Sequence, residues 1–310
     1  MNQPIAIRDA FGQALVKAGY EYDKVVAISC DLKGATKTSE FFSKFPSRSF
    51  EVGIAEANGI GIAAGLALSG YRPFISSFGA FITGKNVEIR TSIAYNAAPV
   101  VVVGTHGGLI GPDGTTQAGL QDITTMRAIP NFIIVQPASA VETKAMVQYL
   151  ASTRQPAYLR IARNELAEIY EHDYKFILGK GHIIRDGTDI TLISSGPPVH
   201  AAAQASDYFG SELKVRVVNM PSLKPIDENL ISQCATETKT IMTIEDHSIE
   251  GGLGSMVSEV VTENGLDCSG IRHGIKDVFT ESGTPSQLEE KYQLDSTGII
   301  EQIKNIPNGN

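Results

Sequence analysis

Two series of short apolar runs divide this chain, and in both series each run is followed by a helical pattern. The first series comprises Val25–Ile28, Pro73–Ser76, Val100–Val103, Phe132–Val135 and Ala157–Ile161. The second comprises Ile190–Ile193, Lys214–Val218 and Thr240–Ile244. Continuous apolar strands that alternate with helices are typical of parallel sheets covered on both faces. The sequence therefore predicts an α/β fold of two domains, each a mostly parallel sheet flanked by helices.

Helical patterns and one irregular stretch set the expected boundaries. In the first series the helical patterns fall at residues 5–18, 55–69, 80–95, 120–128 and 139–152. In the second series they fall at 197–208, 226–233, 252–264 and 284–291. A charged, aromatic stretch without clear periodicity separates the two series. We therefore expect a first domain over residues 1–165, a linker over 166–187 and a smaller domain over 188–310, which suits a chain of 310 residues.

Composition excludes several classes of function. The formal net charge is −8, which argues against a nucleic-acid partner because such proteins carry a basic surface. The three cysteines, Cys30, Cys234 and Cys268, are far apart, odd in number and form no C-x-x-C pair, which argues against a zinc site or a disulfide framework, so we expect free thiols and no metal ligands from this chain. The N-terminal stretch lacks the apolar core of a signal peptide, and no window looks like a membrane span. We expect a cytoplasmic protein with no membrane partner.

Glu56 lies among small and apolar residues in the stretch FEVGIAEANGIGIAAGLALSG, where it is the one acid after Glu51. Burying a lone carboxylate is costly. It is either a first-turn acid favoured by the helix dipole or a carboxyl group in an apolar site, suited to proton exchange.

Gly59, Gly61 and Gly65 resemble a dinucleotide fingerprint, but they lie inside the helical pattern and not at a strand-to-helix turn. We favour close packing of this helix against a neighbour or a partner chain.

A glycine-rich loop, Gly104–Gln117, follows the Val100–Val103 run and contains His106 and Asp113. Ligands of open α/β sheets bind beyond the carboxyl ends of the strands. A simple turn would not need a loop this long. We therefore interpret this segment as a binding loop.

Two further pairs of residues lie at strand ends. Arg160 and Arg163 close the first series, and either could be an ordinary surface arginine or part of a phosphate or carboxylate clamp. Phe78 and Phe81 lie at a strand-to-helix junction, where aromatic residues either fill the core or form a slot for a flat ring.

Taken in order, these residues resemble the C-terminal half of the transketolase family. The motifs are I-x-E-A at 54–57, F-x-x-F at 78–81, T-H-x-G-x-x-G-x-D-G at 105–114, A-R at 162–163, K-P-I-D at 224–227, E-G-G-L-G at 250–254 and E-S-G-T-P at 281–285. Each motif is weak alone, but together they cover nearly the whole chain. The resemblance implies a domain that binds the pyrimidine ring of thiamine diphosphate, followed by the family's C-terminal domain.

The resemblance also implies roles for individual residues. Glu56 would bond the pyrimidine ring nitrogen and activate the cofactor for attack on a ketose, while Phe78 and Phe81 would form the aromatic wall around that ring. His106 would act in catalysis and bind substrate phosphate together with Arg163. Asp113 would contact the hydroxyl groups of the substrate. The implied reaction is transfer of a two-carbon ketol unit between ketose and aldose sugar phosphates.

Three departures from the family pattern qualify these expectations. Gly84 replaces a third wall aromatic, and Gln117 replaces a family histidine, which puts the donor preference in doubt. The family binds the diphosphate and Mg²⁺ through a G-D-G motif in another domain, and this sequence contains no G-D-G. The resemblance therefore implies a split enzyme, in which a separate N-terminal transketolase subunit supplies that half of the site and two copies of each chain form a heterotetramer.

Two alternatives stay open. The chain could be half of another thiamine-diphosphate enzyme, of the deoxyxylulose-phosphate synthase type or the β subunit of a 2-oxoacid dehydrogenase. It could also be a non-catalytic regulatory subunit that has kept the fold. The set His106, Asp113 and Arg163 favours a sugar phosphate over a 2-oxoacid, and the presence of Glu56 speaks against a regulatory subunit.

Overall fold

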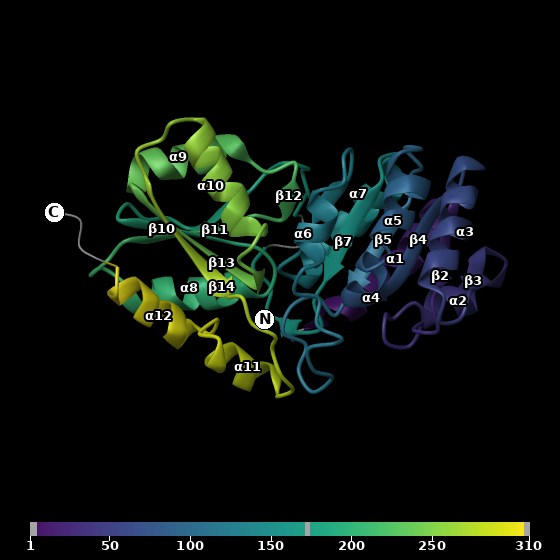
Figure 1. Ribbon diagram of the computed structural model, residues 1–310, viewed down its shortest axis with the longest axis horizontal. Coiled ribbons are helices and arrows are strands. Elements are labelled where there is room, and N and C mark those ends of the chain that lie inside the picture. The colour runs from purple at the N-terminus through teal and green to yellow at the C-terminus, as the bar shows by residue number, and fades with distance from the viewer. Residues whose placement is uncertain (1–4, 171–173, 307–310) are drawn as a thin grey trace.

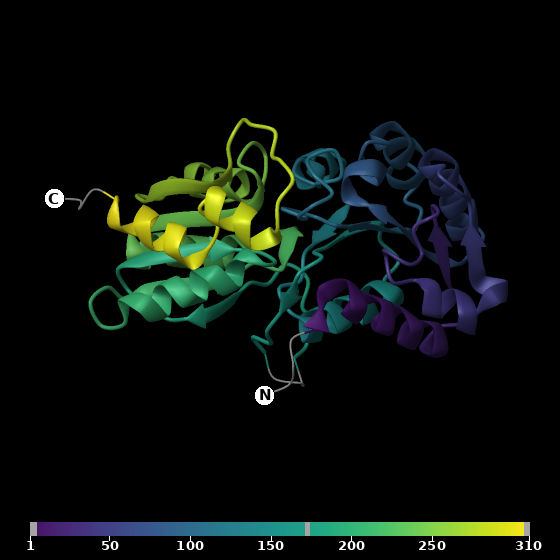
Figure 2. The same ribbon diagram turned by 90° about the horizontal axis from the view of Figure 1, so that it is seen from below.

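Two α/β lobes lie side by side in the structure, a computed structural model that describes residues 5–170 and 174–306 (Figure 1). Each lobe has a central sheet between layers of helices, and the view from below shows the same two-lobed shape (Figure 2). The predicted fold class, two mostly parallel sheets flanked by helices, is confirmed.

The first lobe is built around a seven-stranded sheet of order β12-β6-β7-β5-β4-β2-β3. Its parallel strands are β2 (Val25–Ser29), β3 (Ser49–Glu51), β4 (Arg72–Phe78), β5 (Val101–Thr105), β6 (Ile133–Val135) and β7 (Ala157–Ile161). Every residue of β2, β5 and β7 is buried, as expected for strands covered on both faces. The β-branched runs of the sequence therefore form the centre of the sheet.

Helices cover both faces of this sheet. On one face α1 (Ile7–Glu21), α2 (Ser39–Lys44) and α7 (Ala140–Ser152) bury Phe11, Phe41 and Leu150 in one cluster. On the other face lie α3 (Glu56–Leu68), α4 (Gly79–Thr83), α5 (Asn86–Glu88), the π-helix η2 (Ile89–Ala94) and α6 (Asp122–Arg127). A 3₁₀ turn, η1 (Pro46–Arg48), precedes β3, and a small pair of β1 (Ile5–Ala6) with β8 (Glu165–Leu166) flanks the lobe.

The second lobe is smaller and has a five-stranded sheet of order β14-β13-β10-β11-β9. Its strands are β9 (His182–Arg185), β10 (Ile190–Ser194), β11 (Val215–Asn219), β13 (Thr240–Ser248) and β14 (Ser269–Ile275), of which only β9 is antiparallel to its neighbour. The helices α9 (Glu228–Thr238) and α10 (Leu253–Glu263) cover one face, and α8 (Pro198–Phe209) and α12 (Ser296–Lys304) cover the other. The short helix α11 (Pro285–Lys291) precedes α12.

Several local expectations differ from the structure. The single helix expected at 80–95 is instead α4, α5 and η2, separated at Gly84 and Lys85, because glycine is a poor helix former. The expected linker at 166–187 contains β9, which pairs with β11. The elements α2, β3, β12, β14 and α12 are present in the structure without having been expected from the sequence.

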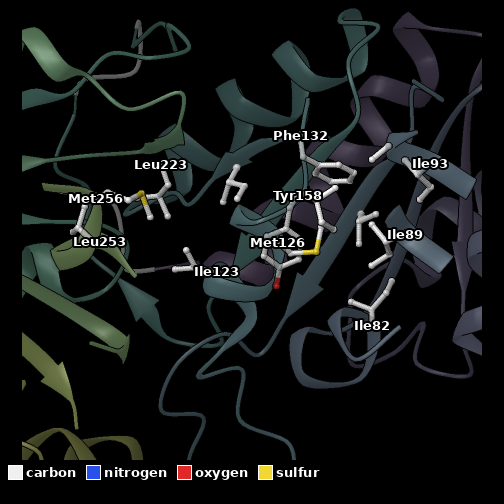
Figure 3. Close-up of a cluster of buried hydrophobic side chains, with 14 of the residues drawn as sticks. Ile82, Ile89, Ile93, Ile123, Met126, Phe132, Tyr158, Leu223, Leu253 and Met256 are labelled. Carbon is white, nitrogen blue, oxygen red and sulfur yellow. The ribbon is translucent and has the colours of Figure 1, made fainter. Parts of the chain in front are cut away.

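A strand and a cluster of apolar side chains connect the two lobes. The chain beyond β11 returns to the first lobe as β12 (Ser222–Lys224) and pairs with β6. Beside it, Met126 and Phe132 of the first lobe belong to the same buried cluster as Leu223, Leu253 and Met256 (Figure 3). The two lobes therefore share one apolar core at their junction.

The state of the cysteines and the character of the helices are two further features of the chain. Cys30 and Cys234 are buried, Cys268 is half-buried, and all three thiols are free. Among the helices within the described ranges, none combines the length and the apolar character needed to cross a bilayer.

Candidate functional site

The predicted site residues gather at the carboxyl ends of three neighbouring strands. Phe78 is the last residue of β4, His106 follows the last residue of β5, and Arg163 lies two residues beyond β7. These strands are adjacent in the order β7-β5-β4. Residues far apart in the sequence are thereby brought to the edge of the sheet where open α/β folds bind ligands.

Glu56 is the first residue of α3 and is only 7% exposed. One of its carboxylate oxygens, Oε1, accepts a hydrogen bond of 2.9 Å from the hydroxyl group of Ser77 on β4. Its place in the first helical turn also suits a negative charge. Glu56 is thus both a first-turn acid and a buried carboxyl group near the carboxyl end of β4.

The glycines after Glu56 lie inside α3, which rules out the strand-to-helix turn of a dinucleotide site. Gly59 faces the sheet, where an added Cβ would lie 2.9 Å from Ile75 Cδ1. Gly61 and Gly65 have open space around them. Close packing within the chain therefore explains the first glycine but not the other two.

Three rings lie together at this edge of the sheet. The rings of Phe78 and Phe81 are nearly parallel, with centroids 5.4 Å apart and 19° between their planes. The imidazole of His106 also contacts Phe78, at 3.9 Å between ring centroids. Phe78 and Phe81, the pair predicted as a slot for a flat ring, are thus partly exposed near the carboxyl ends of the strands and are not buried in the core.

His106 has an unusual backbone and an unusual environment. Its φ is +58°, in the left-handed region that non-glycine residues seldom adopt. The side chain is 3% exposed, and Nδ1 lies 3.0 Å from the hydroxyl oxygen of Thr105. Burial lowers the pKa of His106 to about 4, with further lowering by Arg8 and Arg163 and partial opposition from Asp113. The imidazole is therefore neutral at pH 7.

Arg163 and Asp113 meet in an ion pair. Arg163 Nη1 lies 2.7 Å from Asp113 Oδ2 and also donates to the carbonyl oxygen of Ile110, at 3.4 Å. Both side chains are more than a third exposed. The glycine-rich loop thus brings Asp113 to the arginine that follows β7.

Two of the three departures from the family pattern, Gly84 and Gln117, lie close to these residues in the chain. Gly84 ends α4 and is exposed, so no side chain extends the ring stack there. Gln117 is half-buried, and its side-chain oxygen accepts a hydrogen bond from Thr116. Across the described residues no three His, Cys, Asp or Glu side chains are grouped so that they could hold a metal ion.

Arg160 does not belong to the exposed site, which corrects the suggestion that it clamps a ligand. Its side chain is fully buried and bonds Asp122, with Nε 2.9 Å from Oδ2, and Asp246, with Nη1 2.6 Å from Oδ1. All of these contacts are internal, so the guanidinium group has no face to offer a substrate.

Arg8 is a cation that the sequence analysis missed. It lies in the first turn of α1, and its charge is one of the causes that lower the pKa of His106. Its Nε is buried and, among the described residues, has no hydrogen-bond partner. No signal in the sequence singles it out, because only the fold carries α1 to the end of β5.

Comparison with known proteins places this geometry in a family. The family model for the transketolase pyrimidine binding domain matches residues 3–168, and the model for the transketolase C-terminal domain matches residues 179–299. The chain is 39% identical over 302 residues to a Methanocaldococcus jannaschii protein named for the C-terminal section of a transketolase, covering 96% of this chain and 95% of that one. It is 35% identical over 302 residues to one subunit of the apulose-4-phosphate transketolase of Phocaeicola vulgatus, covering 96% of each.

A solved structure agrees with these relatives. It is described as a split-gene transketolase in the form of an inactive β4 tetramer, is 39% identical to this chain, and superposes with a TM-score of 0.90 over 97% of both chains. The chain therefore belongs to the transketolase family, of which it carries the pyrimidine binding domain and the C-terminal domain.

Proposed function

We propose that this chain is the C-terminal subunit of a split, thiamine-diphosphate-dependent transketolase. In this proposal it moves a two-carbon ketol unit between ketose and aldose sugar phosphates and is active only with a partner subunit, in the cytoplasm. The observation that carries the proposal is the buried carboxyl group of Glu56, bonded to Ser77 at the end of β4, where the next residue, Phe78, begins the ring stack with Phe81. The family membership supports it.

The chemistry of these side chains fits one end of the cofactor. An aminopyrimidine is a flat ring with nitrogen atoms at its rim, so it needs an apolar wall and a hydrogen-bonding group. Phe78 and Phe81 offer the wall. Glu56 Oε1 is already bonded to Ser77, which fixes the carboxyl group in place. Glu56 would hold or pass a proton at the ring nitrogen. When bound, thiamine diphosphate supplies the carbon nucleophile and stores the electron pair released from the ketose.

A cluster of cations favours a phosphorylated substrate. Arg8 and Arg163 both act electrostatically on His106, so the three side chains lie near one another. Guanidinium groups bind phosphate through paired hydrogen bonds. The neutral imidazole of His106 can accept or donate a proton beside them, which fits the catalytic and phosphate-binding roles expected for it. Asp113 would give up part of its contact with Arg163 and bind sugar hydroxyl groups instead.

A partner chain is needed to complete the site. The sequence has no G-D-G motif for the diphosphate and Mg²⁺, and the solved relative that contains only β chains is described as inactive. The outer face of α3 offers a surface for another chain: Gly61 and Gly65 lie open, Leu68 is 62% exposed, and Ile54, two residues before the helix, is 84% exposed. We infer that the N-terminal chain holds Mg²⁺ and the diphosphate, and that two copies of each chain assemble.

Reconstitution tests the proposal. The chain is mixed with its N-terminal partner, thiamine diphosphate and Mg²⁺, and a panel of ketose phosphates with aldose phosphate acceptors is assayed for two-carbon transfer. Activity that needs both chains is the expected result. An intact complex without transfer on any sugar phosphate would refute the proposal, and products formed only with pyruvate would favour the alternative thiamine-diphosphate enzymes. A Glu56→Ala complex that keeps full activity would show that Glu56 has no catalytic role.

A further inference from the structure

The base of the glycine-rich loop is held by backbone hydrogen bonds at His106 and at the two residues that follow it. Gly107 N donates to the carbonyl oxygen of Ile161 on β7, at 3.2 Å. Gly108 N donates to the carbonyl oxygen of Gly119, at 3.0 Å, and Gly119 N donates back to the carbonyl oxygen of His106, at 3.4 Å. His106, with its left-handed backbone, thus belongs to one of two loop segments that are bonded to each other.

Arg160 packs against this loop base and donates a hydrogen bond to it. Its Nη2 donates to the same Gly119 carbonyl oxygen, at 2.8 Å, while Nε bonds Asp122. An added Cβ at Gly107 would lie 2.8 Å from Arg160 Cγ and Nε, so the loop backbone rests directly on the arginine side chain. The Arg160 side chain therefore supports both segments of the loop base, at Gly107 and at Gly119.

Asp246 brings the second lobe into this arrangement. It lies on β13, and its Oδ1 accepts from Arg160 Nη1 at 2.6 Å, while its carbonyl oxygen accepts from Nη2 at 3.1 Å. On its other side, Asp246 Oδ2 would lie 2.0 Å from a Cβ at Gly108, where φ is +87°. Ser248, two residues further along β13, donates its backbone N–H to the carbonyl oxygen of Leu120 at 2.8 Å. The second lobe thus contacts both segments of the loop base.

We propose that Arg160 and Asp246 are positioning residues, through which the C-terminal lobe fixes the backbone of His106 and so the place of its imidazole against Phe78. A buried ion pair of this kind is a costly way to gain stability, but its fixed fork geometry suits the holding of several groups in one arrangement. This assigns the second lobe a part in the site although none of the predicted site side chains comes from it. A role for His106 in substrate binding or catalysis rests on the proposed function, whereas the orientation of the His106 side chain does not.

The histidine signals of the free chain test this proposal. The full chain is labelled at histidine, and His106 is assigned by the signal that is absent in His106→Gln. In the wild type the signal stays flat between pH 5 and pH 7.5, because the pKa of the packed imidazole is about 4. In Asp246→Ala, release of the loop should let the ring hydrate, so the pKa rises toward its ordinary value of 6.5. Loss of the negative charge alone would shift it in the opposite direction.

Gly108→Ala provides a second route to the same result if Asp246→Ala does not fold. Its new methyl group pushes the loop away from Asp246 without removing any charge, and the same upward shift is expected. Lys224→Met is the matched control, since Lys224 Nζ bonds the carbonyl oxygens of Arg127 and Ile129 across the same junction of lobes. This control should lower thermal stability and leave the His106 signal flat.

Folded Asp246→Ala and Gly108→Ala chains whose His106 signal stays flat would overturn the proposal, as would an equal shift in Lys224→Met. These outcomes do not depend on any enzymatic activity. In the reconstituted enzyme, the same variants should raise KM for the ketose phosphate more than they lower kcat. A purely structural loss would instead reduce the amount of active enzyme and leave KM unchanged.

Discussion

Glu142 lies buried where the two lobes and the segment between them meet, and its replacement by glutamine should change how stability depends on pH. The side chain is on α7 and is 0% exposed. Its carboxyl group accepts hydrogen bonds from the backbone of Ala138, at 2.6 Å, and from the hydroxyl group of Tyr174, at 3.0 Å. Asn219 of the second lobe donates to both oxygens, at 3.1 and 3.2 Å. Even so, burial raises the pKa of Glu142 to about 7.

The size and sign of the effect follow from this shift. The unfolded chain releases the Glu142 proton near pH 4.5, whereas the folded chain keeps it until about pH 7. Between these values the unfolded state binds fewer protons, so the free energy of unfolding falls as the pH rises. At 1.36 kcal/mol per unit, the loss amounts to about 3 kcal/mol. The contribution is fully present below pH 4.5 and is gone above pH 7.

Urea unfolding of the wild type and Glu142→Gln, measured from pH 4.5 to pH 8.5, tests this reasoning. Glutamine does not titrate, so it adds an offset that does not vary with pH. The free energy of unfolding of the wild type, minus that of the variant, should fall by about 3 kcal/mol across the range. Glu290→Gln, at an exposed site, is the control and should follow the wild type. A difference that stays constant within about 0.5 kcal/mol would refute the reasoning, because that spread is usual for surface substitutions.

Three further predictions concern charge and assembly. Arg160→Met leaves two carboxylates buried without their cation and should lower the free energy of unfolding by about 3–5 kcal/mol. Arg163→Met, at a partly exposed ion pair, should lower it by only about 0–1 kcal/mol. Equal losses of this free energy in urea unfolding would contradict the contrast. Glu56→Gln should lower the kcat of the reconstituted enzyme by a factor of about 10² or more with little change in thermal unfolding, and an unchanged kcat would remove Glu56 from the mechanism. Gly61→Glu should leave the chain folded but weaken assembly with the N-terminal chain in sedimentation velocity, since it places a charge on the open face of α3; unaltered assembly would exclude that face.

The centre of each sheet was predictable, because a strand buried on both faces is apolar over most of its length. The run Val100–Val103 shows this, and it lies within one residue of the start of β5. The edges were not predictable in the same way. The strand β12 has three residues and gains its place only by pairing with β6, from which it is separated by the end of the first lobe and three strands of the second. No local pattern can report such a pairing.

The positions of the candidate site residues were predictable to the extent that they lie in motifs at strand ends. Phe78 and His106 follow apolar runs closely, and parallel strands bring their carboxyl ends to one edge. Arg8 lies in a helix before the first run, so its approach to His106 depends on how α1 packs across the sheet. The sequence shows that Arg8 is charged, but it does not show where the fold places the side chain.

The two arginines at the end of β7 show why the chemistry of a residue type does not settle its role. Arg160 is the fourth of five residues in β7, and the sheet buries every one of them. Its charge must therefore be neutralised inside the protein, and Asp122 and Asp246 do so. Arg163 lies beyond the end of the strand, pairs with a partly exposed aspartate, and keeps contact with solvent. A guanidinium group can reach a phosphate only in the second setting, so the point at which the strand ends favours the proposed positioning role for Arg160 and leaves Arg163 available for the proposed contact with substrate.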